Sequence, residues 1–300
     1  MNLEIREDIK ENEYDFSQLP VVIFAGGKGI RMKVNYPLSK EWFLIFFQDH
    51  DKELKLEPIF WLNIEILLEL GFKEFYFLVT KEEEKAKEYF EDKLKGKNAN
   101  IQILDREKIS KKVRTEGVNI YVFKQKGIGV AKALAEIKEA IDGRPFLEIF
   151  GDEYFDGEKE AVKRELKNFV NFAIEKIKYD NALKVEAFVR KENTISNISE
   201  AERRYCIKEN GELDIVEDSN VIVTSLSLSS PAIIDFFEEK GIKDFNNFET
   251  QKELIETGRI YGKVINLNFA NINTKEDYLA VMLYTLNTIK NTNNKLLKIR

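Results

Sequence analysis

Segment 21–40, VVIFAGGKGIRMKVNYPLSK, carries the residue types that phosphate binding requires. It opens with Val21–Phe24, a short apolar run that is typical of a buried central strand in a parallel sheet. Three glycines follow within four positions, and without Cβ atoms they allow backbone N–H groups to surround an anion. These glycines are Gly26, Gly27 and Gly29. Because Arg31 and Lys40 add positive charge, the segment predicts a loop for a nucleotide's phosphates.

Other glycine-rich phosphate loops fit this segment less well. The pattern G-x-x-x-x-G-K-[ST] is absent. The dinucleotide fingerprint G-x-G-x-x-G begins with Gly27 and Gly29, but Met32 occupies the position of its third glycine. Tyr36-Pro37 also interrupts the helix that this fingerprint requires. An ordinary glycine-rich turn with two solvated cations remains the structural alternative.

Composition narrows the class of protein. The chain has 300 residues, of which 43% are hydrophobic and 33% charged, as in a soluble globular protein that can bury a core. Its net charge of −6 argues against nucleic acid as a partner. No run approaches the ~18 apolar residues of a membrane-spanning helix. The charged segment 1–18 has no apolar signal sequence, so we expect a cytoplasmic protein without a membrane partner.

The few cysteine and histidine residues limit the chemistry further. Cys206 is the only cysteine and His50 the only histidine, which excludes an internal disulfide, a zinc cluster and a histidine-based triad. A bound metal ion would therefore be a hard cation held by oxygen atoms, and Mg²⁺ is the expected cofactor. The polar, basic segment 105–117 is more readily explained as a solvated insertion than as a substrate contact.

Strands and helices alternate through the first half of the chain. Apolar runs predict strands, and amphipathic segments predict helices between them. The expected strands are 21–24, 75–80, 101–104, 119–123 and 145–150, and the expected helices 57–71, 81–95 and 130–141. This order predicts a parallel sheet with right-handed crossovers. Ligands bind at the carboxyl ends of such strands, where the glycine loop and Gly151-Asp152 both lie.

The second half begins with a long helix and then becomes richer in strands. The expected helices are 158–177, 231–240, 248–257 and 274–288, and the expected strands 182–190, 203–208, 212–217, 221–228, 260–265 and 267–269. Asn210-Gly211 predicts a hairpin turn. Without a linker between the halves, the pattern predicts one α/β domain over 19–300 with a smaller β-rich lobe, after the extension 1–18.

Four ordered motifs resemble those of the sugar-1-phosphate nucleotidyltransferases. Segment 26–32 with Ser39-Lys40 resembles the signature loop G-G-x-G-T/S-R-L/M, which is followed by P-K or S-K; Ile30 replaces its hydroxyl residue. Segment 129–134 is similar to G-T-A-x-A-L, with Val130 as the departure. The other two motifs are the G-D pair at 151–152 and the N/D-I-N/D-T-x-E-D run at 271–277.

The resemblance implies a fold, a reaction and a division of the chain. The fold would be a Rossmann-like three-layer αβα sandwich with a mostly parallel sheet and a smaller β-rich sugar-binding lobe. About 19–157 would form the nucleotide-binding half and 158–300 the sugar-binding half. The reaction would be Mg²⁺-dependent transfer of a nucleotidyl group from an NTP to a small phosphorylated sugar. A homo-oligomer is possible.

The same resemblance assigns roles to individual residues. Arg31 and Lys40 would be catalytic, and Asp152 and Asn271 would hold the metal ion. Nucleotide binding would involve Ala25, Gly26, Gly27, Lys28, Gly29, Gln125 and Gly129. Tyr205 and Glu217 would bind the sugar, although Cys206 replaces the glycine of a Tyr-Gly pair and Glu217-Asp218-Ser219 stands where Glu-Lys-Pro is usual.

Two alternatives stay open at this point. One keeps the fold but transfers a cytidylyl or guanylyl group to a polyol phosphate, an aminosugar phosphate or molybdopterin. The other is a catalytically weak nucleotide-sensing or scaffold homologue, which the departures at Ile30, Val130 and Cys206 favour. The combination of Arg31 with Lys40, Asp152 and Asn271 favours an enzyme. The base and the sugar are left undetermined.

Overall fold

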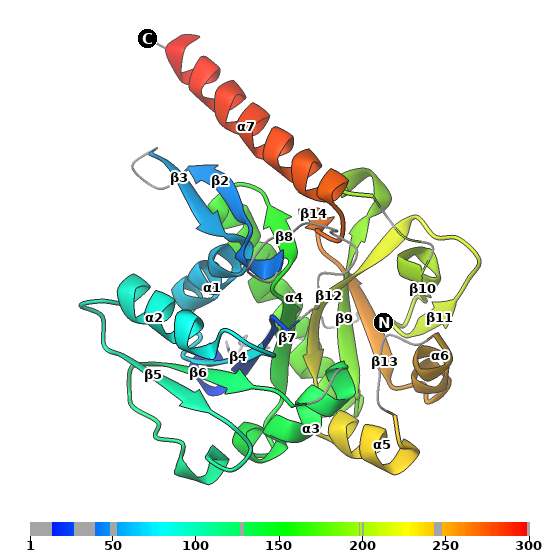
Figure 1. Cartoon of the computed structure of the whole chain (residues 1–300). Coiled ribbons are helices and arrows are strands. Elements are labelled where there is room, and N and C mark those ends of the chain that lie inside the picture. Colours follow the sequence, from blue (N-terminus) through cyan, green and yellow to red (C-terminus); the bar gives the residue numbers. More distant parts are fainter. Residues whose placement is uncertain are drawn as a thin grey trace, which may run out of the picture.

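A mostly parallel sheet forms the centre of this computed structural model, which describes residues 14–26, 40–48, 53–126, 129–197, 199, 201–242 and 248–298 (Figure 1). Within these ranges eight strands pair in the order β13-β9-β12-β7-β1-β4-β6-β5. All neighbours are parallel except β12, which is antiparallel to β7 and β9. The strands are β1 Pro20–Phe24, β4 Glu74–Val79, β5 Ala99–Leu104, β6 Val118–Lys124, β7 Phe146–Phe150, β9 Lys184–Arg190, β12 Val221–Ser229 and β13 Ile260–Val264.

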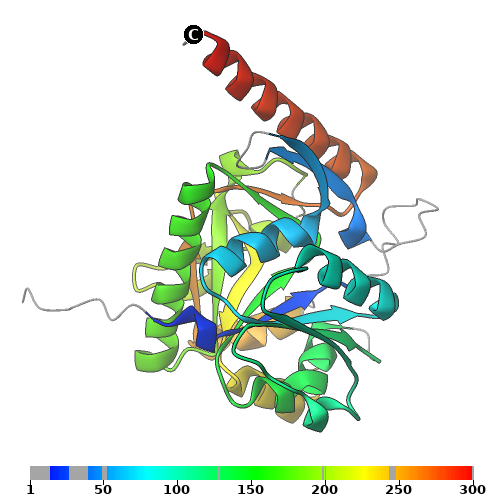
Figure 2. The ribbon, with the colours of Figure 1, turned by 90° about the vertical axis from the view of Figure 1, so that its left-hand side faces the viewer.

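Helices cover both faces of this sheet and make the three-layer arrangement (Figures 1 and 2). One core joins side chains of α1, α2 and α4 to Val21 and Ile23 of β1. The other core joins α3, α5 and α6 to Val22, because successive strand residues face opposite sides. The helices are α1 Ile59–Glu69, α2 Glu83–Lys93, α3 Val130–Ile141, α4 Lys159–Tyr179, α5 Ala232–Lys240, α6 Phe248–Glu256 and α7 Lys275–Lys298.

Three small two-stranded sheets surround the central one. The first is a hairpin of β2 Leu44–Gln48 and β3 Leu54–Pro58, and the second joins β8 Glu153–Asp156 to β14 Asn268–Asn271. The third joins β10 Tyr205–Ile207 to β11 Leu213–Ile215 through the expected turn at Asn210-Gly211, where Gly211 has φ +89°. The sequence analysis did not assign β2, β3 and β8 as strands, although β3, LKLEP, alternates apolar and polar residues.

The predicted fold class is confirmed, with one refinement in the second half. The strands β9, β12 and β13 belong to the central sheet and not to a separate lobe. In the described part of the second half, the β structure outside that sheet consists of the β10–β11 ribbon and β14. The final helix α7 continues to Lys298, ten residues beyond the predicted end at 288, since no glycine or proline stops it. None of the helices in the described ranges is long and apolar enough to cross a membrane.

The segment 105–117 is mostly exposed, as expected for a solvated insertion, but two of its cations anchor it to the sheet. Its Lys112 and Arg114 approach the carboxylate of buried Glu74 at 3.3 Å each. Arg144 binds both oxygens of that carboxylate at 2.9 Å, and the Tyr76 hydroxyl donates to it at 2.6 Å. Burial alone would raise the pKa of Glu74, but the bonds from Arg144 and Tyr76 and the charge of Lys112 lower it to about 2.

We expect Glu74 to make stability depend on pH. Its pKa is lower in the folded protein than its ordinary value of 4.5, so its contribution is present above pH 4.5 and is lost as the pH falls towards 2. By pH 3 the loss should be about 2 kcal/mol. Urea unfolding of the wild type and Glu74→Gln at pH 7 and pH 3 measures it. The variant should be less stable at pH 7, and an equal dependence on pH in both proteins would contradict this role.

Candidate active site

The carboxyl ends of β1 and β7 lie side by side, because these two strands pair in parallel register from Val21 with Leu147 to Phe24 with Phe150. The chain therefore leaves both strands at one edge of the sheet. The Gly151 N–H donates to the Phe24 carbonyl at 3.0 Å, and a Cβ atom on Gly151 would lie 3.5 Å from the Cβ of Ala25. The start of the glycine loop and Asp152 are thus neighbours, as the strand order predicted.

An ion pair between Lys40 and Asp152 lies at this edge. The Lys40 ammonium group also donates to Asn273 Oδ1 at 3.1 Å and to the Ile272 carbonyl at 3.4 Å. The two side chains of the pair are only 12% and 7% exposed. A lysine from the end of the glycine loop is therefore held by oxygen atoms from two other motifs, so three distant parts of the sequence share one site.

Asn271 reaches the same site through the pairing of β14 with β8, in which it stands opposite Glu153. Its Nδ2 donates to Glu202 Oε1 at 3.2 Å. Its Oδ1 atom is buried and has no hydrogen-bond partner among the described residues. A buried carbonyl oxygen without a donor is a candidate ligand for a cation.

Glu153 was not predicted and is a buried carboxylate of the site, only 2% exposed. Both of its oxygens accept the Ser225 N–H, at 2.9 and 3.0 Å. Burial raises the pKa of Glu153 well above its ordinary value, the Ser225 hydrogen bonds lower it, and the negative charges of Asp152 and Glu202 raise it further. Glu153 follows the predicted Asp152 directly, but nothing in the sequence distinguishes a buried carboxyl group from a solvated one.

Two of the predicted nucleotide-binding residues, Gly26 and Gln125, are also brought together. A Cβ atom on Gly26 would lie 2.4 Å from Gln125 Nε2 and 3.1 Å from Thr80 Cγ2, so the absence of a side chain makes room for the Gln125 amide. Gly129 is the N-cap residue directly before α3 and has φ +103°, a conformation that other residues rarely adopt. Four further predicted residues, together with Ile30, lie outside the described residues. These four are Gly27, Lys28, Gly29 and Arg31.

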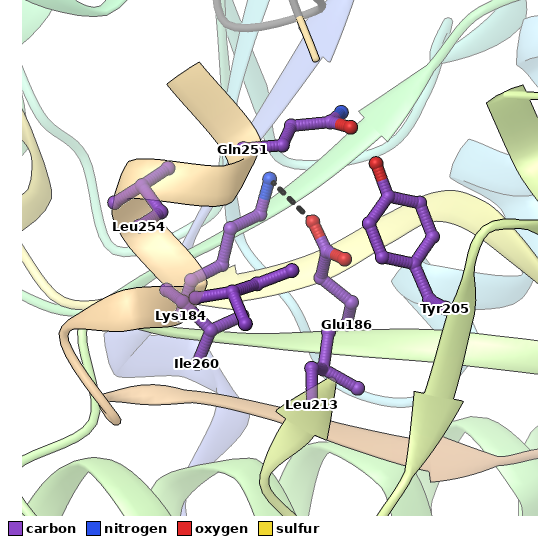
Figure 3. A pocket seen from close by; sticks show the side chains of 8 residues that line it. Lys184, Glu186, Tyr205, Leu213, Gln251, Leu254 and Ile260 are labelled. Atoms are coloured by element: carbon purple, nitrogen blue, oxygen red, sulfur yellow. Dashed lines mark ion pairs between the residues drawn. The ribbon is translucent and has the colours of Figure 1, made fainter. Parts of the chain in front are cut away.

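Of the two predicted sugar-binding residues, Tyr205 lies apart from this cluster. Tyr205 is buried and lines a cavity of about 10 Å³ with Gln251 and the ion pair of Lys184 with Glu186 (Figure 3). This volume holds about one water molecule. Lys184 is the first residue of β9, so the cavity lies towards the amino ends of the parallel strands, away from Asp152. Glu217 is exposed. The sugar-binding roles of Tyr205 and Glu217 stay predictions.

The residues present fit a magnesium ion that is shared with a substrate. The Asp152 carboxylate and the free Asn271 Oδ1 are oxygen ligands of the kind that Mg²⁺ prefers. No group of three or more His, Cys, Asp or Glu residues suited to a metal ion occurs in the described ranges. The protein would therefore supply few ligands, and substrate phosphates and water would complete the six oxygens around the ion.

Solved structures resemble the chain over most of its length. A protein described as a glucose-1-phosphate thymidylyltransferase from Bacillus anthracis, in complex with sucrose, is 14% identical with a TM-score of 0.59, covering 89% of this chain and 95% of its own. Apo UDP-glucose pyrophosphorylase is 17% identical with a TM-score of 0.59, covering 90% and 99%. HddC from Yersinia pseudotuberculosis is 18% identical with a TM-score of 0.56, covering 89% and 99%.

These likenesses define the architecture. The chain has a mixed α/β fold with a large, mostly parallel central sheet flanked by helices. More narrowly, it has the fold of the sugar-1-phosphate nucleotidyltransferases, as the four motifs predicted. No protein-family profile matches the sequence, and no curated protein matches it. At 14–18% identity the comparisons establish the fold alone.

Because Lys40 and Asp152 form an ion pair, we expect the effects of their substitution on the free energy of unfolding to be coupled. Lys40→Met leaves a buried carboxylate without its cation, and we expect the free energy of unfolding to fall by about 3 kcal/mol. The double variant Lys40→Met/Asp152→Asn removes both charges and should regain most of this loss. Urea unfolding at pH 7 of the wild type, both single variants and the double variant measures the coupling. Strictly additive effects would show that the two side chains do not interact.

Proposed function

We propose that this chain is a Mg²⁺-dependent nucleotidyltransferase that acts in the cytoplasm on a nucleoside triphosphate and a sugar-1-phosphate. The observation that carries the proposal is the cluster at the carboxyl ends of β1 and β7, where Lys40 meets Asp152 and the unpartnered Oδ1 of Asn271 is close by. This cluster stands at the start of a glycine loop in a fold shared with enzymes of nucleotide-sugar synthesis.

In the proposed reaction a phosphate oxygen of the sugar-1-phosphate attacks the α-phosphorus of the triphosphate. A new P–O bond forms as the bond to the β-phosphate oxygen breaks, and pyrophosphate leaves with the electron pair. No protein nucleophile is needed, since such transfers depend on positioning and on neutralising charge. The products are an NDP-sugar and pyrophosphate.

The chain's own residues bind and orient the reactants in this scheme. Glycine-loop N–H groups bind the phosphates, and Lys40 with Arg31 offsets negative charge on the α-phosphate and on the leaving group. Gln125 binds the edge of the base. Its side-chain amide lies beside Gly26, which has no Cβ atom and so leaves space for that amide. Asp152 and Asn271 would hold Mg²⁺, which supplies Lewis-acid activation of the α-phosphate when it is bound.

A different phosphorylated acceptor is the second candidate within the same reaction class. Asp218 occupies the position where the resembling enzymes usually carry lysine, and it pairs with Arg203 at 3.4 Å and Lys191 at 3.9 Å. An acidic residue at this position favours an acceptor that does not need that lysine. A polyol phosphate, an aminosugar phosphate or molybdopterin would be such an acceptor.

Nucleotide binding tests the proposal before the acceptor is known. A ligand that binds only the native protein raises its melting temperature, so we expect one of UTP, CTP, GTP, dTTP and ATP to raise it most, and to raise it more with Mg²⁺. Thermal-shift assays of the wild type measure this effect. The matched control is Lys40→Met/Asp152→Asn, which removes both charges of the ion pair. In this variant the part of the melting-temperature increase that depends on Mg²⁺ should be lost.

Turnover completes the test with the nucleotide so identified. Pyrophosphate release with a panel of sugar-1-phosphates and the other acceptors should be at least about 100-fold slower in Asp152→Asn than in the wild type. A wild type that binds no triphosphate would favour the scaffold alternative. Binding without turnover on any acceptor would favour a nucleotide-sensing protein.

We further propose that a second copy of the chain packs on α7 and the β2–β3 hairpin. Six of the eight large apolar side chains that are exposed in the described ranges lie there: Leu44, Leu54, Leu56, Leu279, Leu283 and Leu286. The three on α7 are spaced by four and three residues, as in the seam of a two-helix coil. A leucine face with this spacing can pair with the same face of a second copy of the chain.

Helix α7 also projects beyond the body of the molecule, which leaves this face accessible (Figures 1 and 2). We expect the wild type to be at least a dimer and Leu279→Glu/Leu283→Glu to be a monomer, because two buried charges per copy would separate the helices. Light scattering coupled to size-exclusion chromatography measures the mass. A monomeric wild type, or a variant of unchanged mass, would contradict this surface.

A further inference from the structure

The carboxamide of Asn271 lies between two different surroundings. On one side its Nδ2 donates to Glu202 Oε1 at 3.2 Å. On the other side its Oδ1 is buried without a hydrogen-bond partner in the described part of the chain. Glu202 belongs to none of the motifs that suggested the site, and it lies 69 residues before Asn271 in the sequence.

The hydrogen-bonding capacity of the Glu202 carboxylate determines whether the NH₂ group or the oxygen of the Asn271 side chain faces it. An ionised carboxylate only accepts hydrogen bonds, so the amide must turn its NH₂ group towards Glu202. The other oxygen of Glu202 is already engaged, because Oε2 accepts from the Ser199 N–H and from its hydroxyl group, each at 2.6 Å. Asn271 Oδ1 is therefore forced to point away from Glu202.

The segment 195–197, a few residues before Glu202, is held against β14 and the start of α7. The Ile195 N–H donates to the Phe269 carbonyl at 2.7 Å, and the Asn271 N–H donates to Ser196 Oγ at 3.0 Å. The Asn197 N–H donates to Asp277 Oδ1 at 3.1 Å. These bonds fix the backbone of Asn271, whereas the Glu202 carboxylate is held by its hydrogen bonds from Ser199.

We infer that Glu202 is a positioning residue that orients and polarises Asn271 so that its Oδ1 can bind a divalent cation. The inference rests on the proposed function. An amide carries no net charge and so binds a cation more weakly than a carboxylate does. A charge-assisted hydrogen bond from its NH₂ group to Glu202 shifts electron density towards Oδ1, as carboxylates do behind the ligands of other metal sites. The Asn271–Glu202 pair thereby takes the place of a directly coordinating carboxylate.

Binding of Mn²⁺ alone tests this role without turnover. The signal of free Mn²⁺ in electron paramagnetic resonance reports the bound fraction. We expect Glu202→Gln to bind Mn²⁺ at least about 10-fold more weakly, since the charge is lost and a glutamine no longer dictates how Asn271 turns. The matched control is Glu192→Gln, which removes the same charge from an exposed position of the same loop and should bind as the wild type does.

A rescue experiment separates positioning from a purely structural role. In Asn271→Asp/Glu202→Gln the ligand has two equivalent oxygens and needs no orientation, so Mn²⁺ affinity should return to near the wild-type value. In Asn271→Asp alone, the new carboxylate would face the carboxylate of Glu202, where Asn271 Nδ2 and Glu202 Oε1 are now 3.2 Å apart. We expect that variant to have a lower melting temperature than the double variant, because like charges repel at this distance.

The results distinguish this inference from the proposed function. Unchanged Mn²⁺ affinity in Glu202→Gln, or failure of the double variant to regain it in a folded protein, would overturn the role of Glu202. A wild type that takes up no Mn²⁺ would overturn it as well. The nucleotidyl transfer is judged separately, by pyrophosphate release from the wild type.

Discussion

The parallel pairing of β1 with β7 is the constraint on which the site depends. It places the end of each strand at one edge of the sheet, so that the start of the glycine loop and Asp152 meet although they are far apart in the sequence. The pairing of β8 with β14 then adds the segment 271–273 from near the end of the chain. Lys40 joins these parts by contacting oxygen atoms of Asp152, Ile272 and Asn273. A nucleotide that binds here would meet residues from three elements whose relative positions are fixed by backbone hydrogen bonds.

Buried polar groups lie at both ends of the parallel strands. At the amino ends they serve stability, and at the carboxyl ends they serve the proposed function. Glu74, at the start of β4, is surrounded by Lys112, Arg114 and Arg144, and its hydrogen-bonding capacity is filled. Such a group holds the loop 105–117 in place but leaves no oxygen for a ligand. At the carboxyl ends, Asp152 has Lys40 close by, whereas Asn271 Oδ1 has no described partner. An incompletely satisfied group is costly in a folded protein, and a ligand that satisfies it gains that energy on binding.

Much of the architecture follows from local pattern. Helix α3 occupies Val130–Ile141 as predicted, because its apolar residues repeat with helical spacing after a glycine that can adopt positive φ. The central strands were evident as apolar runs, since both of their faces are covered by helices. The hairpin β2–β3 escaped prediction because it is partly exposed and packs on α7, and strand β8 because it has only four residues and is defined by its pairing with β14. The end of α7 was placed too early, because its polar final turns carry no apolar period.

The sequence by itself determined the fold class and predicted several residues that meet in the cluster, because strand–helix alternation and the motifs at 151–152 and 271–277 are local properties of the chain. Only the tertiary structure decided which groups touch. It brought Lys40 to Asp152, buried Glu153 behind them and set Glu202 against Asn271. It also placed Tyr205 beside Lys184 and Glu186, towards the opposite end of the strands. These contacts join residues tens to hundreds of positions apart, and burial and pairing depend on the packing of whole elements, which no local pattern encodes.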